Sequence, residues 1–286
     1  MGGERIDIRA SVAADVVVTA AGPRLTATVG TRAGSNLVLG IDEAGRGPAL
    51  GAMVLAAVAL TPAASRRLSR AGVADSKSFG AGPEAHEARS ALARLVEQHA
   101  TFLAFELCDV ETVDAYVVRG ALNVLERERA ERFIRSAPPC KRIIADGKRL
   151  FGALRVIFPH LEAIDRAEEH HVAVAAASIC AKVRRDELFA CIAARYGHEF
   201  GPMGGHGYTN AATRAFTRAY VRKFGRLPPE ARQTWPWPRH GGVAGHRIEA
   251  AAEPEAALAP LAPGAEEGGA GRIDAPADGR LAARTG

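Results

Sequence analysis

Short apolar runs alternate with longer segments of helical periodicity through the middle of this 286-residue chain. Residues 37–41 and 53–60 are apolar runs of strand length, whereas residues 84–99 space their apolar side chains three and four positions apart. Strands that alternate with helices along a chain build an α/β domain around a central sheet. We therefore expect an α/β fold, in a chain long enough for one full domain and additional ends.

The expected elements follow from the period of the apolar positions. Strands are predicted at residues 37–41, 53–60, 102–107, 142–145 and 154–158. Helices are predicted at residues 84–99, 110–135, 172–196 and 211–224.

The two ends of the chain differ from its middle in composition. Residues 1–36 are expected to form a loosely ordered extension, in which residues 16–18 have strand character. Residues 241–286 consist largely of Ala, Gly, Pro and Glu, and we expect disorder because such a segment cannot offset its ordering entropy by burial. Residues 37–240 keep 29 of the 37 basic and 22 of the 32 acidic residues. A basic body suits a polyanionic partner such as nucleic acid, although a small positive charge also simply aids solubility.

Cysteine usage and the N-terminus indicate a cytoplasmic protein. The four cysteines are scattered without a Cys-x-x-Cys pair, which is typical of reduced thiols and not of a disulfide framework or a zinc site. Charged residues interrupt the N-terminus before the apolar core of a secretory signal can form. No run of about 18 uncharged apolar residues predicts a membrane span. The sequence carries no oligomerisation signal, so we expect a monomer.

Acidic residues stand at the ends of two predicted strands. Asp42 and Glu43 follow an apolar run and precede Gly45-Arg46-Gly47, and Asp146 follows another apolar run. Neighbouring carboxylates repel one another and lose hydration when buried, unless a cation joins them. Oxygen-rich clusters of this kind suit Mg²⁺ or Mn²⁺. The alternative is a solvated strand end and an ordinary Asp-Gly turn.

Five motifs in order resemble those of the ribonuclease HII family, over roughly residues 37–238. They are Asp42-Glu43-Ala44-Gly45-Arg46-Gly47-Pro48, Asp75-Ser76-Lys77, Asp146-Gly147, the helix segment from Ala176 to Asp186, and Gly207-Tyr208. The resemblance implies a ribonuclease H-like fold, which is a mixed central sheet flanked by helices with a helical C-terminal portion. Residues 37–240 would then be the catalytic domain.

The resemblance also implies a site. Four carboxylates would hold two divalent ions, Mg²⁺ or Mn²⁺, and Asp42, Glu43 and Asp146 match three of them. The backbone of Gly45, Arg46 and Gly47 would contact the 2′-hydroxyl of a ribonucleotide. Further substrate contacts are implied for Tyr208, which matches a tyrosine at the RNA–DNA junction, and for Lys182, Ser178 and Lys77.

The fourth carboxylate departs from the family pattern. Eight residues before Ala176 the family usually has Asp, and this chain has Glu168. The sister family, ribonuclease HIII, resembles this chain at that position. Glu168 is therefore the predicted fourth ligand, and Asp165 is the alternative. Glu168 and Glu169 would also suit the amino end of a helix for purely structural reasons.

The implied activity is that of an endonuclease that hydrolyses the RNA strand of RNA–DNA hybrids. It would also cut at ribonucleotides embedded in duplex DNA, by a two-metal mechanism that leaves 5′-phosphate and 3′-hydroxyl ends, in DNA replication and repair. Three alternatives stay open. They are a ribonuclease HIII-like enzyme that needs longer hybrids, a non-catalytic nucleic-acid-binding relative, and a metal-dependent DNA nuclease on the same broad fold.

Overall fold

The computed structural model describes residues 17–19, 22–28, 36–74, 79–80 and 82–237. Within these ranges no helix is long and apolar enough to cross a membrane.

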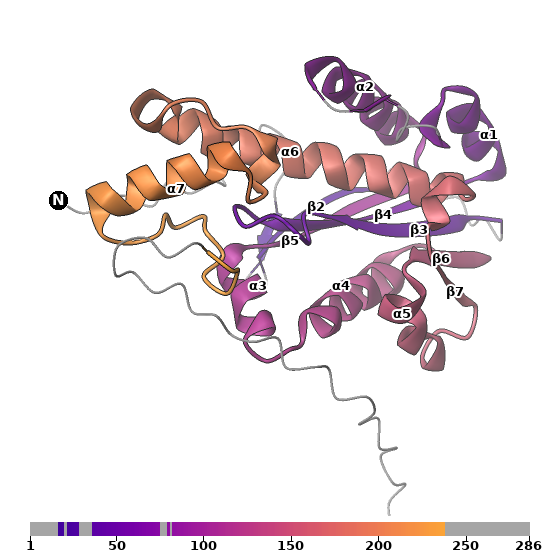
Figure 1. Ribbon diagram of the computed structural model, residues 1–286. Coiled ribbons are helices and arrows are strands. Elements are labelled where there is room, and N and C mark those ends of the chain that lie inside the picture. The colour runs from indigo at the N-terminus through magenta and orange to yellow at the C-terminus, as the bar shows by residue number, and fades with distance from the viewer. Residues whose placement is uncertain (1–16, 20–21, 29–35, 75–78, 81, 238–286) are drawn as a thin grey trace, which may run out of the picture. The chain divides into compact units, whose positions relative to one another are not determined.

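A mixed β-sheet forms the centre of the described chain (Figure 1). Its strand order is β1-β2-β5-β4-β3-β6-β7. The strands are β1 (Val17–Thr19), β2 (Gly22–Thr28), β3 (Val38–Ala44), β4 (Met53–Leu60), β5 (Phe102–Cys108), β6 (Arg142–Asp146) and β7 (Leu161–Ile164). The strand β3 pairs antiparallel with β4 and parallel with β6, and β7 continues the parallel part. The carboxyl ends of β3, β6 and β7 therefore lie along one edge of the sheet.

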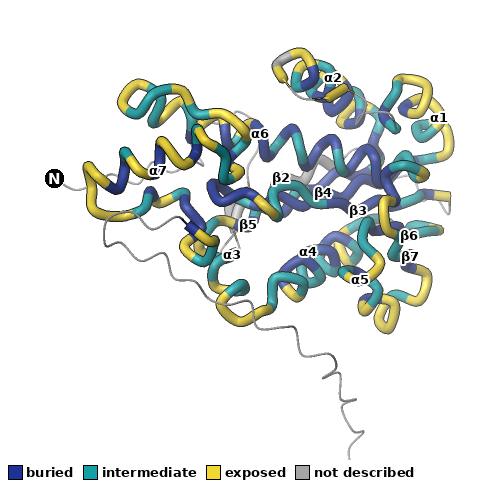
Figure 2. The backbone as a smooth tube through the Cα atoms, in the orientation of Figure 1, coloured by how far each residue is buried: buried dark blue, intermediate teal, exposed yellow. Residues whose placement is uncertain are grey.

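Helices cover both faces of the sheet. One face packs under α1 (Pro62–Arg70), α2 (Pro83–His99) and the long α6 (Val172–Phe200). The other packs under α3 (Val110–Val117), α4 (Leu122–Ser136) and α5 (Lys148–Phe151). The buried residues accordingly follow the sheet and the inner sides of the helices (Figure 2). This arrangement confirms the expected mixed sheet flanked by helices.

The carboxyl-terminal helix α7 (Ala211–Phe224) packs against the far part of α6 through an aromatic cluster. Tyr196 and Phe200 of α6 contact Phe216 and Tyr220 of α7, with ring centroids between 5.2 and 5.6 Å apart. The expected helical C-terminal portion is therefore present within the described residues.

Helix α6 lies unusually close to β3. A Cβ atom at Gly40 would stand 2.1 Å from the carbonyl carbon of Ala173, so only glycine fits there. The facing side of α6 consists mostly of alanines, which permit this approach. The close packing fixes the amino-terminal half of α6 above the end of β3, where Asp42 lies.

Two predicted elements differ from the structure. Residues 154–158 were expected to be a strand, but Gly152–Val156 forms a 3-10 helix, η3, and the strand is Leu161–Ile164. Within that apolar run Leu154 points inward, whereas Val156 is 84% exposed, so the run has no continuous buried face to pair. The helix expected over 110–135 is divided into α3 and α4, because Gly120 adopts a left-handed backbone conformation between them.

The predicted domain limits meet the described residues only in part. Strands β1 and β2 fall inside the expected N-terminal extension, and β2 pairs antiparallel with β5, so the sheet begins before residue 37. The predicted tail, 241–286, lies outside the described residues.

Candidate active site

Parallel pairing brings the predicted carboxylates to one edge of the sheet. Ile41 of β3 pairs with Ala145 of β6, so the next residues, Asp42 and Asp146, lie beside each other where the pairing of these two strands ends. Asp146 accepts a hydrogen bond at Oδ1 from the amide of Ala167, 2.9 Å away. That bond holds the 3-10 turn η4 (Ala167–Glu169) against β6 and brings Glu168 to the same place.

Asp42 and Glu43 leave β3 toward opposite faces of the sheet. Asp42 lies on the α6 side, where the Ser178 hydroxyl hydrogen-bonds to it and Glu168 faces it. Glu43 lies toward α4, where Glu126 and the Arg46 guanidinium face it. The Glu43 amide donates to Asp42 Oδ1 at 2.8 Å, which turns the Asp42 carboxylate back across the strand end.

Burial and mutual repulsion disfavour the charged forms of these groups. Burial raises the pKa of Asp42 from 3.8 to about 7, and the charges of Asp146 and Glu168 add to the rise. Burial likewise raises the pKa of Asp146 to about 6, with a further contribution from its hydrogen bond to Glu168. The pKa of Glu43 lies well above its ordinary value, first because of burial and then because of Asp42. A bound cation would relieve all of these penalties.

The donor chemistry of the group fits a hard divalent cation. It consists of carboxylate oxygens from Asp42, Glu43, Asp146 and Glu168, the ligand type that Mg²⁺ and Mn²⁺ prefer. Among the described residues, however, no three His, Cys, Asp or Glu side chains already stand as a closed ligand set. What the structure shows is that these carboxylate oxygens lie near one another.

The two candidates for the fourth carboxylate occupy different surroundings. Glu168 is buried and interacts with both Asp42 and Asp146. Asp165 is exposed, and its Oδ1 accepts a hydrogen bond of 2.6 Å from the backbone amide of Lys148. The structure thus groups Glu168 with the other carboxylates and gives Asp165 a role in holding the turn after β6.

The loop Gly45-Arg46-Gly47 is held from behind by a residue far along the chain. Arg232 is fully buried and donates hydrogen bonds to the carbonyl oxygens of Gly45, at 2.5 Å, and Arg46, at 2.8 Å. The indole of Trp235 donates to the Gly47 carbonyl at 3.0 Å. The N–H and C=O of a trans peptide point in opposite directions. The bonds from Arg232 therefore turn the N–H groups of Arg46 and Gly47 away from it.

The Arg46 side chain is occupied within the protein. Its guanidinium pairs with the fully buried carboxylate of Glu126 and donates to Asn123 Oδ1 at 2.6 Å. Both partners belong to α4, so this contact ties the loop to the helix beneath Glu43. The guanidinium is therefore held by α4, although the side chain as a whole is still 40% exposed.

Tyr208 lies beside this loop. Its side chain is exposed, and a Cβ atom at Gly47 would stand 3.2 Å from its ring. The Gly207 carbonyl accepts hydrogen bonds from the amides of Ala49 and Leu50, at 2.9 and 3.1 Å, which fastens the tyrosine segment next to the glycine loop.

The remaining predicted contacts lie on or near α6. Ser178 contacts the carboxylate group through Asp42, so the structure gives it a site-organising position. Lys182, one turn further along, is partly exposed and lies 3.3 Å from Asp186. Lys77 lies outside the described residues.

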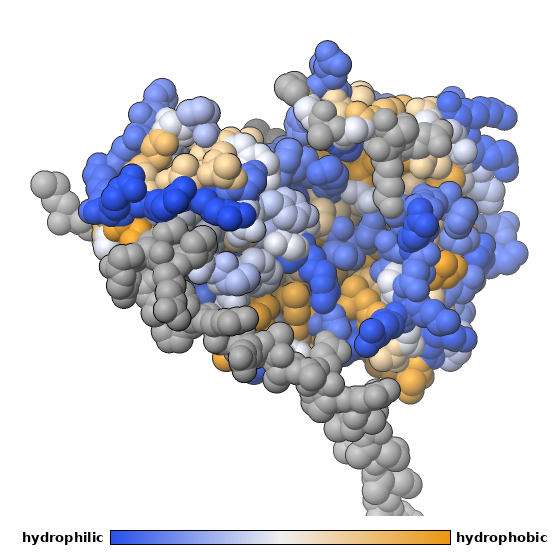
Figure 3. All heavy atoms as spheres, viewed as in Figure 1, coloured by the Kyte–Doolittle hydropathy of each residue, from blue (hydrophilic) through white to orange (hydrophobic). Residues whose placement is uncertain are grey.

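A basic surface continues beyond these residues. Helix α7 contains no acidic residue, and its exposed positions include Arg214, Arg218 and Arg222. The space-filling view shows strongly hydrophilic side chains gathered along this helix (Figure 3). This surface suits a polyanionic partner.

Sequence reasoning missed the residues that support the glycine loop. Arg232 and Trp235 belong to an irregular segment without hydrophobic periodicity, so no pattern connects them with residue 45. Glu126 offered one signal of a buried ion pair. It is an acid directly after the apolar Leu125 within the helix predicted over 110–135.

Comparisons with known proteins match most of this chain to one family. The family model for ribonuclease HII matches residues 39–236. Ribonuclease HII of Pyrobaculum neutrophilum is 36% identical over 202 residues, which cover 69% of this chain and 93% of that protein.

Two solved structures are also similar. Ribonuclease H2 from Pyrococcus horikoshii has a TM-score of 0.61 and 28% identity, over 70% of this chain and 93% of that one. Ribonuclease HII from Archaeoglobus fulgidus, solved as a complex with PCNA, has a TM-score of 0.58 and 29% identity, over 71% of this chain and 96% of that one. From the family model and these relatives, this chain belongs to the ribonuclease HII family and is a ribonuclease H endonuclease.

Proposed function

We propose that this enzyme cuts the RNA strand of RNA–DNA hybrids and also cuts at single ribonucleotides embedded in duplex DNA. The observation that carries the proposal is the contact between two features. The buried carboxylates lie at the end of β3, and the loop formed by Gly45, Arg46 and Gly47 follows directly, with Tyr208 packed on it. Chemistry at a phosphate and recognition of a ribose can therefore take place within one short stretch of backbone.

The proposed metal ligands are Asp42, Glu43, Asp146 and Glu168, with Mg²⁺ or Mn²⁺ as the ions. A pair of such ions, when bound, supplies an activated water and neutralises charge at the phosphate. The chain's own groups orient the ligands, because the Glu43 amide holds Asp42 and the Ala167 amide holds Asp146. Hydrolysis of this type leaves 5′-phosphate and 3′-hydroxyl ends.

Selectivity for RNA is assigned to the glycine loop and the tyrosine. The outward N–H groups of Arg46 and Gly47 are suited to hydrogen-bond a 2′-hydroxyl, which is the group that distinguishes RNA from DNA. The absence of a side chain at Gly47 lets the Tyr208 ring approach, and that ring offers a surface on which a sugar can pack. A nucleotide without the 2′-hydroxyl would leave these donors unpaired.

The deciding experiment compares three duplexes of equal length with Mg²⁺ and with Mn²⁺, and maps each cut. We expect cleavage of an RNA–DNA hybrid and of a DNA duplex with one ribonucleotide, and no cleavage of all-DNA duplex. Cleavage of the long hybrid alone would indicate a ribonuclease HIII-like preference. Cleavage of all-DNA duplex would indicate a DNA nuclease, and binding without any cleavage would indicate a non-catalytic relative.

A further inference from the structure

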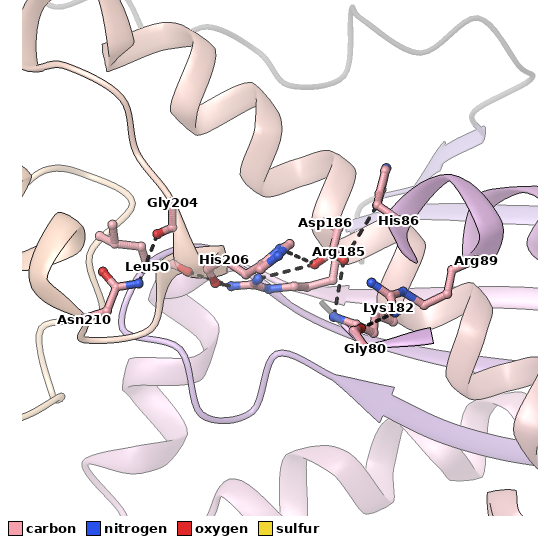
Figure 4. Close-up of polar contacts among 10 residues, drawn as sticks. All are labelled: Leu50, Gly80, His86, Arg89, Lys182, Arg185, Asp186, Gly204, His206 and Asn210. Atoms are coloured by element: carbon pink, nitrogen blue, oxygen red, sulfur yellow. Dashed lines mark hydrogen bonds and ion pairs between the residues drawn. The ribbon is translucent and has the colours of Figure 1, made fainter. Parts of the chain in front are cut away.

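A buried carboxylate on α6 gathers four nitrogen-bearing side chains beyond the carboxylate group described above (Figure 4). The side chain of Asp186 is 2% exposed. Its oxygens lie 2.9 Å from His206 Nδ1, 3.3 Å from Lys182 Nζ, 3.7 Å from Arg185 Nη1 and 3.9 Å from His86 Nδ1. These groups come from α2, α6 and the turn η5 (Gly205–Gly207), so Asp186 connects three separate segments.

The cluster carries more positive charge than one carboxylate neutralises. Lys182 and Arg185 are both cations, and each imidazole adds a charge whenever it is protonated. Arg185 is buried and directed inward, since its Nη2 donates to the carbonyl oxygen of His206. The side chains of Lys182, His206 and His86 are 44%, 43% and 41% exposed, so they present this excess charge to the solvent.

The cluster lies in line with the carboxylates along α6. Ser178 contacts Asp42, and Lys182 and Asp186 follow on successive turns of the same helix face. Eight residues of α-helix span about 12 Å. At the other end, His206 is two residues from Tyr208. The cluster is therefore flanked by the two features assigned to cleavage and to ribose recognition.

We propose that Lys182, His206 and His86 form a phosphate-binding site for the nucleic-acid backbone beside the cut, and that Asp186 is the residue that positions them. The inference rests on the proposed function for its ligand, a nucleic-acid strand, but it concerns binding and not cleavage. Donors held in place by a buried carboxylate lose less conformational entropy when a phosphate binds than free side chains do. His206 also has a left-handed backbone, with φ of 50°, and its Nδ1 lies 2.9 Å from Asp186.

An ordinary structural network would use the same contacts only to join α2, α6 and η5. The two readings differ in what a substitution changes. A structural network affects the free energy of unfolding, whereas a phosphate site affects the affinity for a duplex and its dependence on salt.

The first test uses binding of a fluorescent all-DNA duplex, followed by anisotropy in Mg²⁺ across a salt series. His206→Gln and Lys182→Gln should each weaken binding about fivefold, as expected for loss of one charge-assisted contact. For Lys182→Gln the slope of log affinity against log salt should fall by about one. His206→Lys should retain or increase the affinity. His160→Gln, which alters an exposed histidine near the start of β7, is the matched control and should leave binding unchanged.

Asp186→Asn separates positioning from simple attraction. The substitution removes a negative charge, so attraction alone predicts tighter duplex binding. If Asp186 positions the donors, binding weakens despite the added positive charge, and KM rises more than kcat falls. Tighter binding by Asp186→Asn, or wild-type affinity in His206→Gln, would overturn the proposal. If Asp186→Asn does not fold, the His206→Gln and His206→Lys pair decides. Loss of cleavage with normal duplex binding would count against the proposed function and leave the phosphate site intact.

Discussion

Asp42→Asn should make the metal-free protein more stable while it abolishes cleavage. Burial raises the pKa of Asp42 from 3.8 to about 7, so the folded protein holds this proton more tightly than the unfolded chain does. The free energy of unfolding therefore falls as the pH rises from about 4 to about 7. Above that range the full cost of burying the charged carboxylate is reached. A shift of about three units corresponds to an upper limit of about 4 kcal/mol.

Asparagine removes the charge and keeps the shape. Its side-chain oxygen can still accept the 2.8 Å hydrogen bond from the Glu43 amide. The neighbouring carboxylates also titrate and share the penalty, so the full upper limit is not reached. We expect the free energy of unfolding of Asp42→Asn to exceed that of the wild type by about 2–3 kcal/mol at about pH 8. The gain should be about 2 kcal/mol smaller at about pH 5, where the wild-type carboxyl is already largely protonated.

Urea unfolding in a metal chelator at the two pH values measures this gain. Glu87→Gln is the matched control, since it neutralises an exposed carboxylate in the middle of α2 and should change little. Saturating Mg²⁺ should stabilise the wild type more than Asp42→Asn, because the ion relieves the same repulsion. The reasoning is refuted if Asp42→Asn is no more stable than the wild type at about pH 8 without metal.

Three further predictions concern the neighbours of this group. Glu168→Gln should lower kcat by about a hundredfold or more. Asp165→Asn keeps its hydrogen bond to the backbone and should lower kcat little. The reverse order would show that Asp165, and not Glu168, is the fourth ligand. Arg232→Lys should lower kcat/KM for a single embedded ribonucleotide at least about tenfold, because one ammonium group cannot hold the loop carbonyls in the same geometry. A kcat/KM near the wild-type value would show that the loop keeps its shape without Arg232. Gly40→Ala should destabilise the protein by about 3 kcal/mol or more in urea unfolding, since the new Cβ meets the α6 backbone. The control is Gly204→Ala, because a Cβ at that position meets open space.

The positions of three carboxylates at strand ends were predictable because they follow from local rules. Apolar runs that end in acids place Asp42, Glu43 and Asp146 at strand ends, and parallel pairing then brings those ends together. A central sheet with helices was predictable from the alternation of strands and helices, and the resemblance added that the sheet is mixed. The family resemblance added Glu168, whose surroundings periodicity alone does not indicate.

The errors arose where long-range packing decides the structure. The apolar run at 154–158 has strand composition, but its neighbours bury only Leu154. The support of the glycine loop by Arg232 depends on a contact across 187 residues, which no local pattern encodes. The ion pair between the Arg46 side chain and Glu126, 80 residues away, is likewise encoded by no local pattern.

The dependence of the loop on Arg232 and Trp235 has a consequence for how the enzyme is made. The proposed metal ligands are all synthesised by residue 168, and the sheet by residue 164, yet the loop obtains its supports only when residues 232–235 are added. A chain that stops or is cut before that segment can still collect its acids at the edge of the sheet. It lacks the bonds that orient the backbone of residues 45–47, to which we assign the recognition of ribose. Premature termination or proteolysis in this segment would thus yield a nuclease core without its proposed means of distinguishing RNA from DNA.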